Sequence, residues 1–245
     1  MKAALFEAVR RARAEQRAVV LATLLPDGVQ HLLDPADAAT PTALPAAVRQ
    51  AAARAAARDQ SATVELSAED GGGRWFLQPW NPPLRLILVG AVHIAQPLSR
   101  MAALCDFAVV VVDPRAAFAT EERFPGVARK GEWPDVAIAA LRPDRRTAIV
   151  TLTHDPKLDD PALDAALRSP AFYVGCLGSG KTHRARIGRL QRRGFSEADA
   201  ARLRGPVGLR IGARSPAEIA VSILAEIIQT LRPDPVAAPA PSAAP

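Results

Sequence analysis

The fold of this chain is decided by Leu84-Arg-Leu-Ile-Leu-Val-Gly90-Ala-Val-His-Ile-Ala95 and by the later segment Phe107-Ala-Val-Val-Val-Val-Asp113. An apolar segment runs into a glycine turn, and a second apolar segment ends in a carboxylate 23 residues after Gly90. This order is typical of a dinucleotide-binding βαβ unit, in which helix amides hold a phosphate and the acid binds a ribose. The G-x-G-x-x-G/A pattern, however, has Val92 in place of its second glycine. A β-branched side chain there would stand where the backbone must approach a pyrophosphate, so Val92 argues against NAD.

Residues 84–231 alternate between apolar segments and segments with helical periodicity. We predict strands at 84–89, 107–113, 147–152, 171–175 and 207–211, with helices between them and a final helix over 216–231. Helix caps are expected at Asp160-Pro161, at Ser196 with Asp199, and in the capping box Ser215-Pro-Ala-Glu218. The predicted fold class is therefore α/β, a Rossmann-like parallel sheet with helices on both faces.

Residues 1–80 predict a small α+β domain. A helix at the start is followed by a strand, a Pro26-Asp27-Gly28 turn and a returning strand. An alanine-rich helix and a second strand pair around three glycines complete it. Prolines 79, 82 and 83 mark the boundary to the α/β domain, residues 81–231. The Pro/Ala-rich segment 232–245 is expected to be a disordered tail.

The charge of the chain is concentrated in one block. Between Lys181 and Arg204 eight basic residues face two acids, which equals the net charge of +6 of the whole chain. Aromatic residues are 4% of the sequence, so the composition does not suggest a nucleic-acid binder. We interpret the block either as a local site for a small anion or acidic partner, or as a solvated helix face.

The remaining composition points to a cytoplasmic protein without a membrane span. No window of about 18 residues is free of charges or turn formers, and the first helix lacks the residue order of a secretory signal. The chain has two cysteines, Cys105 and Cys176, without C-x-x-C spacing, and we expect both to be buried free thiols.

One glycine-rich segment matches the nucleotide-binding pattern G-x-x-x-x-G-K-[ST]. It is Gly175-Cys-Leu-Gly-Ser-Gly180-Lys181-Thr182, between a predicted strand and a predicted helix. No apolar strand ending in Asp follows it to supply a magnesium ligand, so we do not expect ATP hydrolysis. Phosphate binding at this helix N-terminus remains a hypothesis.

Eight ordered motifs over about Pro79–Leu231 resemble the C-terminal Rossmann domain of the XdhC/CoxI family, the xanthine dehydrogenase accessory factors. The motifs include Gly90-Ala-Val-His-Ile-Ala, Val112-Asp-Pro-Arg115, Glu122-Arg-Phe-Pro125, Thr151-Leu-Thr-His154-Asp155 and Tyr173-Val-Gly-Cys-Leu-Gly-Ser179. They continue with Arg184-Ala-Arg-Ile-Gly-Arg-Leu190, Gly205-Pro-Val-Gly-Leu209 and the stretch from Ile211 to Glu226.

The resemblance implies a chaperone that binds the pyranopterin molybdenum cofactor and supports its maturation and insertion into a molybdenum hydroxylase such as xanthine dehydrogenase. The implied partners are the client apoprotein and a cysteine desulfurase, and a homodimer is in keeping with it. Residues 1–80 lack the family's Gly-Ser-x-Pro-Arg and Gly-Gly-Cys-x-Glu segments and contain no cysteine. The family's N-terminal domain is therefore expected to be shortened or degenerate here.

Candidate binding residues gather where the predicted parallel strands end. We assign no catalytic residue, and no metal site, because His154 has no second histidine at ligand spacing. Two other functions stay open: an NAD(P)-dependent oxidoreductase on the same fold, supported by Asp113 but opposed by Val92, and an interaction module without a ligand. The cofactor-binding candidates are Gly90, His93, Asp113, Arg115, His154, Gly178, Ser179, Lys181 and Arg184.

Overall fold

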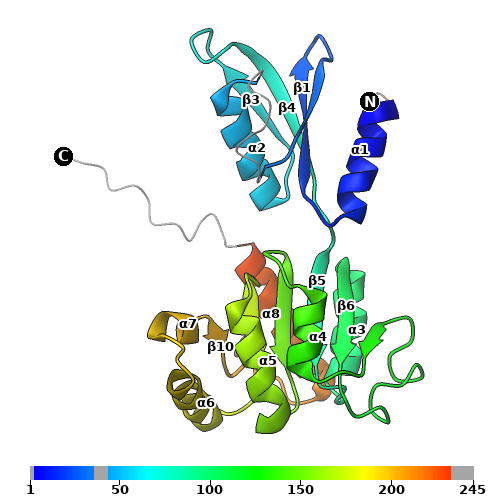
Figure 1. Ribbon diagram of the computed structural model, residues 1–245, viewed down its shortest axis with the longest axis vertical. Helices are drawn as coiled ribbons and strands as arrows, with labels where there is room; N and C mark the ends of the chain where they lie inside the picture. The colour runs from blue at the N-terminus through cyan, green and yellow to red at the C-terminus, as the bar shows by residue number, and fades with distance from the viewer. Residues whose placement is uncertain (1–2, 36–43, 233–245) are drawn as a thin grey trace, which may run out of the picture. The chain divides into compact units, whose positions relative to one another are not determined.

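The computed structural model describes residues 3–35 and 44–232, which divide into two compact units, Met1–Pro82 and Pro83–Pro245. Each unit is shown in Figure 1 and is described by itself. The tail predicted for 233–245 lies outside the described residues.

The first unit is a four-stranded antiparallel sheet with helices. The order of its strands is β2-β1-β4-β3, and every described pairing between them is antiparallel. The alanine face of α2 packs on one side of this sheet, and small side chains allow the helix to approach the strands closely. The elements are α1 (Ala3–Ala14), β1 (Val19–Leu25), β2 (Gln30–Leu33), α2 (Ala46–Arg58), β3 (Ala62–Leu66) and β4 (Gly73–Trp80).

The second unit is a six-stranded parallel sheet of order β10-β9-β8-β5-β6-β7. Numbered from β5, this is the order 3-2-1-4-5-6 of doubly wound dinucleotide folds, in which the strand order reverses between the first and fourth strands. The predicted α/β class is therefore confirmed. The strands are β5 (Leu84–Val89), β6 (Phe107–Val112), β7 (Ala128–Lys130), β8 (Thr147–Thr151), β9 (Tyr173–Cys176) and β10 (Leu203–Arg204).

Helices cover both faces of the parallel sheet. One core cluster lies between the sheet and the pair α3 (Ala95–Leu104) and α8 (Pro216–Leu231). The other lies under α4 (Pro134–Leu141) and α5 (Pro156–Arg168), with Leu190 of α6 (Gly180–Arg192) at its margin. Figure 1 shows α4 and α5 on the near face, and α6, α7 (Glu197–Ala201) and β10 together at one edge. The strands are apolar on both faces because neither face meets water.

The predicted strand at 207–211 is wrong. Gly208 has a φ of 98°, its N–H donates to the Glu226 carboxylate at 2.8 Å, and the Leu209 N–H donates to the Ser222 carbonyl at 3.1 Å. The Val207 N–H still donates to the Cys176 carbonyl of β9, but Gly208 and Leu209 bond to α8, so no strand continues here and the sixth strand is the shorter β10 before it. The three-residue strand β7 was not predicted at all.

The predicted cap at Asp160 is also wrong. Helix α5 begins one turn earlier, because the Asp155 side chain accepts from the Lys157 N–H at 2.9 Å and Pro156 occupies the first helical position. Pro161 then lies inside the helix, where Asp160 faces α6. The capping boxes predicted at Ser196 and Ser215 are confirmed.

Candidate functional site

The candidate residues lie along the carboxyl edge of the parallel sheet. Gly90 follows β5, Asp113 follows β6, His154 lies just beyond β8, and Gly178 lies just beyond β9. Because these strands are parallel and in register, their carboxyl ends meet at one edge, where open α/β sheets bind ligands.

The glycine turn after β5 packs closely against the loop that follows β8. Gly90 has a φ of 108°, and a Cβ there would lie 2.5 Å from the Thr153 Cγ2, so the turn needs glycine for its conformation and for its close approach. Val92 is half-buried and packs on the α3/α8 core cluster, which places its side chain in the core. His93 is exposed in the turn before α3.

Asp113 is fully buried, and the protein itself satisfies its carboxylate. One oxygen accepts from the Ala91 N–H at 2.8 Å and from the Arg115 Nη2 at 2.8 Å. The other accepts from the Arg115 N–H and Nε, each at 2.9 Å. Burial alone would raise the pKa of Asp113, but these hydrogen bonds outweigh it and hold the pKa below its usual value. Both oxygens of this carboxylate are therefore already bonded within the turn, which argues against the expectation that Asp113 binds a ribose.

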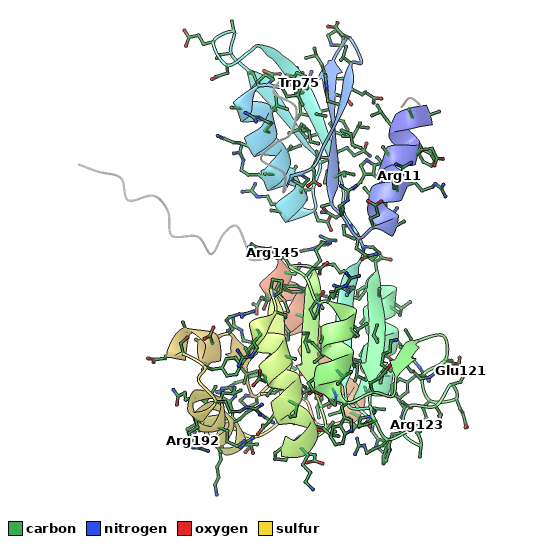
Figure 2. All side chains as sticks on the ribbon, viewed as in Figure 1. Arg11, Trp75, Glu121, Arg123, Arg145 and Arg192 are labelled. Carbon is green, nitrogen blue, oxygen red and sulfur yellow. The ribbon has the colours of Figure 1, made fainter. Side chains whose placement is uncertain are left out.

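The Arg115 side chain is also bonded within the protein. Its guanidinium forms the salt bridge to Asp113 and lies 4.4 Å from the centre of the Phe118 ring. Phe118 belongs to the loop between β6 and β7, in which Figure 2 labels Glu121 and Arg123. To bind a cofactor, as the sequence analysis expects, Arg115 would have to share these bonds.

The loop after β8 connects the turn to the next helix. His154 is exposed with a φ of 63°, whereas the Thr153 hydroxyl beside it donates to the Asp159 carboxylate at 2.6 Å. Asp155 is used as the cap of α5. No group of three metal-ligating side chains occurs among residues 3–35 and 44–232.

The N-terminus of α6 carries two cations that have no protein partner in the described part of the chain. The Ser179 hydroxyl caps the helix by accepting from the Thr182 N–H at 3.1 Å, and it lies 2.9 Å from the Thr182 hydroxyl. Lys181 and Arg184 are exposed, and the structure gives neither side chain a hydrogen bond or ion pair within the described residues. A Cβ at Gly180 would lie 3.8 Å from the Arg184 Nη1, so the Arg184 side chain folds back over the first turn.

Four of the other six basic residues of the block bond to acids or carbonyls inside the domain, which corrects the interpretation of the block as one solvated face. Arg189 forms a two-bond salt bridge to Asp160 at 2.6 and 2.9 Å, and Arg193 lies 3.0 Å from Asp164. Arg202 donates to backbone carbonyls at the end of α5. Arg192, labelled in Figure 2, is exposed on α6 at the opposite side of the domain from Arg123.

A buried polar cluster lies just below the N-terminus of α6, and sequence reasoning missed it. Arg186 is 2% exposed; its Nη2 is 3.2 Å from the Asp159 carboxylate, and its Nη1 is 2.9 Å from the Cys176 Sγ. The hydroxyl of Thr151, which pairs in register with Cys176, is buried without a hydrogen-bond partner among the described residues, as is the Nε of Arg186. The sequence contained one signal: Arg186 lies four residues before the apolar Leu190, on the face of α6 that is buried.

Burial shifts the pKa of the two titratable groups that contact Arg186, namely Asp159 and Cys176. Burial raises the pKa of Asp159 even though Thr153 and Arg186 oppose it, and burial raises the pKa of the Cys176 thiol to about 11. Cys176 is thus a buried thiol, as predicted, whereas Cys105 is exposed and the prediction for it is wrong.

Comparison with known proteins identifies the family. The XdhC Rossmann domain model matches residues 86–227, more than half of the chain. A probable xanthine dehydrogenase subunit of Bacillus subtilis is 34% identical over 169 residues, 69% of this chain and 49% of that protein. The molybdenum cofactor insertion chaperone PaoD of Escherichia coli is 31% identical over 148 residues, 60% of this chain and 40% of that protein. This chain therefore spans half or less of the length of these two curated relatives.

A solved structure shares the fold. The protein from Bacillus halodurans described as a xanthine dehydrogenase matches with a TM-score of 0.69 and 22% identity, over 94% of this chain and 67% of that chain. Among the described helices none has both the length and the apolar character to span a membrane. The family predicted from the eight motifs is confirmed: the chain belongs to the XdhC family, and residues 86–227 form its Rossmann domain.

Proposed function

We propose that this chain is an accessory factor that binds the molybdenum cofactor through its pyranopterin phosphate and supports its maturation and insertion into a molybdenum hydroxylase. A maturation role is supported by the family and by the name of the relative PaoD. The finer statement, that the cofactor binds at the carboxyl edge of the sheet, rests on the side chains at the start of α6.

The observation that carries the proposal is the pair of cations at the N-terminus of α6, which no described residue neutralises. The helix dipole disfavours Lys181 and Arg184 at that end, and an anion there would be bound by both cations as well as by the dipole. The residues fit a phosphate: Lys181 and Arg184 would hold it, next to Gly178 and Ser179. The bound cofactor would supply molybdenum chemistry to the client enzyme, while the side chains of this chain bind and orient it.

The remaining candidates have smaller parts in this proposal. Gly90 brings the β5 turn against the β8 loop, and Asp113 with Arg115 holds that turn in place. His93 and His154 are exposed along the same edge and are proposed to contact the outer part of the cofactor.

The properties of the cysteines support a separate protein as the source of sulfur. Cys176 is fully buried with a raised pKa, so it is a poor sulfur carrier, and residues 1–80 contain no cysteine. Cys105 is exposed, but it precedes β6 and therefore lies at the amino edge of the sheet, opposite the carboxyl edge that carries the candidate site. Sulfur for the cofactor would therefore come from another protein, a cysteine desulfurase, before transfer to the client apoprotein. We place this process in the cytoplasm and propose a homodimer as the assembly.

The test compares charges at the two ends of α6. Lys181→Ala and Arg184→Ala are expected to reduce the cofactor that co-purifies with the protein, measured as molybdenum content and as pterin fluorescence after oxidation. The same variants should leave the ligand-free protein equally or slightly more stable, because each removes a cation from the unfavourable end of the dipole. Arg192→Ala, at the other end, is the matched control and should keep the cofactor. Equal losses in all three variants would refute a specific site at the start of α6.

A further inference from the structure

We propose that a cleft formed by the loop after β10 is a second anion-binding site, which takes the phosphate group of a small molecule. The cleft has a volume of about 340 Å³ and is lined by Arg204, Gly205, Arg210 and Glu226, among others. None of these residues belongs to the start of α6, so the inference does not depend on the proposed function.

The charge of the cleft favours an anion. Arg204 and Arg210 are exposed, and within the described part of the chain neither guanidinium has a hydrogen bond or ion pair. Glu226 is the one acid among the described lining residues, and its Oε2 already accepts the Tyr173 hydroxyl and the Gly208 N–H. Two guanidinium groups with free donors therefore line the cleft, together with one carboxylate whose Oε2 is already bonded within the protein. Arginine is suited to this role because its planar fork of donors matches a phosphate.

The backbone of the loop is fixed against its neighbours, so the cleft exists before a ligand arrives. A Cβ at Gly208 would overlap the Ser222 hydroxyl on α8, and the Leu209 N–H donates to the Ser222 carbonyl at 3.1 Å. On the other side the Val207 N–H donates to the Cys176 carbonyl at 3.1 Å, which ties the loop to β9. A site whose backbone is held in place loses less entropy on binding than a mobile loop would.

The cleft borders the first turn of α6 but is distinct from it. His183, between Lys181 and Arg184 in the sequence, packs its ring directly on Gly205. The pKa of His183 is lowered by burial and then by Arg186, so the ring adds no charge to the cleft at neutral pH. Arg204 and Arg210 are therefore the cations that would hold a phosphate in this cleft.

The experiment uses the full chain, labelled with ¹⁵N and titrated with inorganic phosphate at low ionic strength. We expect the amide signals of Gly205 and of residues 207–210 to shift until they saturate. Arg204→Gln and Arg210→Gln should each weaken this binding about tenfold, the loss expected for one charge-assisted hydrogen bond. Arg192→Gln, an exposed arginine outside the cleft, is the control and should not change it, and Arg210→Lys should recover part of the loss.

Three results would overturn the proposal. One is the absence of shifts at Gly205 and residues 207–210, and another is an equal weakening by Arg192→Gln, which would mean that phosphate binding depends on the overall charge. The third is a set of shifts confined to residues 178–182, which would favour the α6 site of the proposed function while refuting the cleft. All the substituted side chains are exposed, so unchanged thermal unfolding will confirm that the variants fold.

Discussion

Replacing Arg186 by methionine should destabilise the domain more than any other single change in the basic block. Arg186 and Asp159 are 2% and 1% exposed, and their ion pair joins α6 to α5. Methionine retains much of the side-chain volume but leaves the buried Asp159 carboxylate with the Thr153 hydroxyl as its hydrogen-bond donor. Breaking a buried pair by removing one partner costs about 3–5 kcal/mol, because it leaves an uncompensated charge away from water.

The same substitution three residues later supplies the control. Arg189 also pairs with an acid of α5, Asp160, but its side chain is 30% exposed. A salt bridge in contact with water contributes about 1 kcal/mol or less, so Arg189→Met should cost correspondingly less than Arg186→Met. Both energies are measured by equilibrium urea unfolding followed by far-UV circular dichroism.

The pH dependence tests the cause of the loss. In Arg186→Met the pKa of Asp159 should rise further, since burial raises it and Arg186 is one of the groups that lower it. Protonation of Asp159 then removes the unpaired charge, so the loss of stability relative to the parent should shrink as the pH falls from neutrality toward about 4. The double variant Arg186→Met with Asp159→Leu should be more stable than Arg186→Met alone. A cost no larger than that of Arg189→Met, or one independent of pH, would refute the reasoning.

Three further outcomes are expected. Gly90→Ala should destabilise the fold more than Gly126→Ala in thermal unfolding, because both glycines have positive φ but only the first would bring a Cβ within 2.5 Å of Thr153; equal losses would contradict this. Burial lowers the pKa of His183, so the free energy of unfolding should fall as the pH drops below about 6.5, the pKa of the unfolded state. In His183→Gln this pH dependence should be weaker, as measured by urea unfolding at several pH values. Calorimetric titration with NADH should detect no micromolar binding, because the Asp113 carboxylate is already bonded; such binding would favour an oxidoreductase.

Much of the fold could be predicted because its signals are local. Apolar segments such as 84–89 and 107–113 become strands wherever helices cover both faces, and a capping box such as that at Ser215 specifies a helix start from four residues. The elements that failed were those whose hydrogen bonds go to distant partners. The segment 207–211 is apolar like a strand, but Gly208 and Leu209 bond to α8. The sequence of the segment alone does not show whether its backbone bonds to a strand or to a helix.

The order of the amino acids was enough to predict the α/β class, the family and the carboxyl edge at which the candidate residues lie. Which charges remain available for a ligand depends on the folded domain. The eight basic residues of the block look alike in sequence, yet Arg186 is buried against Asp159 while Lys181 and Arg184 stay exposed without a partner among the described residues. An ion pair depends on the distance between two side chains in space, and a separation of 27 positions along the chain, from residue 159 to residue 186, does not encode that distance. Asp113 is a second example. Its position in the sequence is that of a ribose ligand, but in the folded domain it is bonded to Ala91 and Arg115.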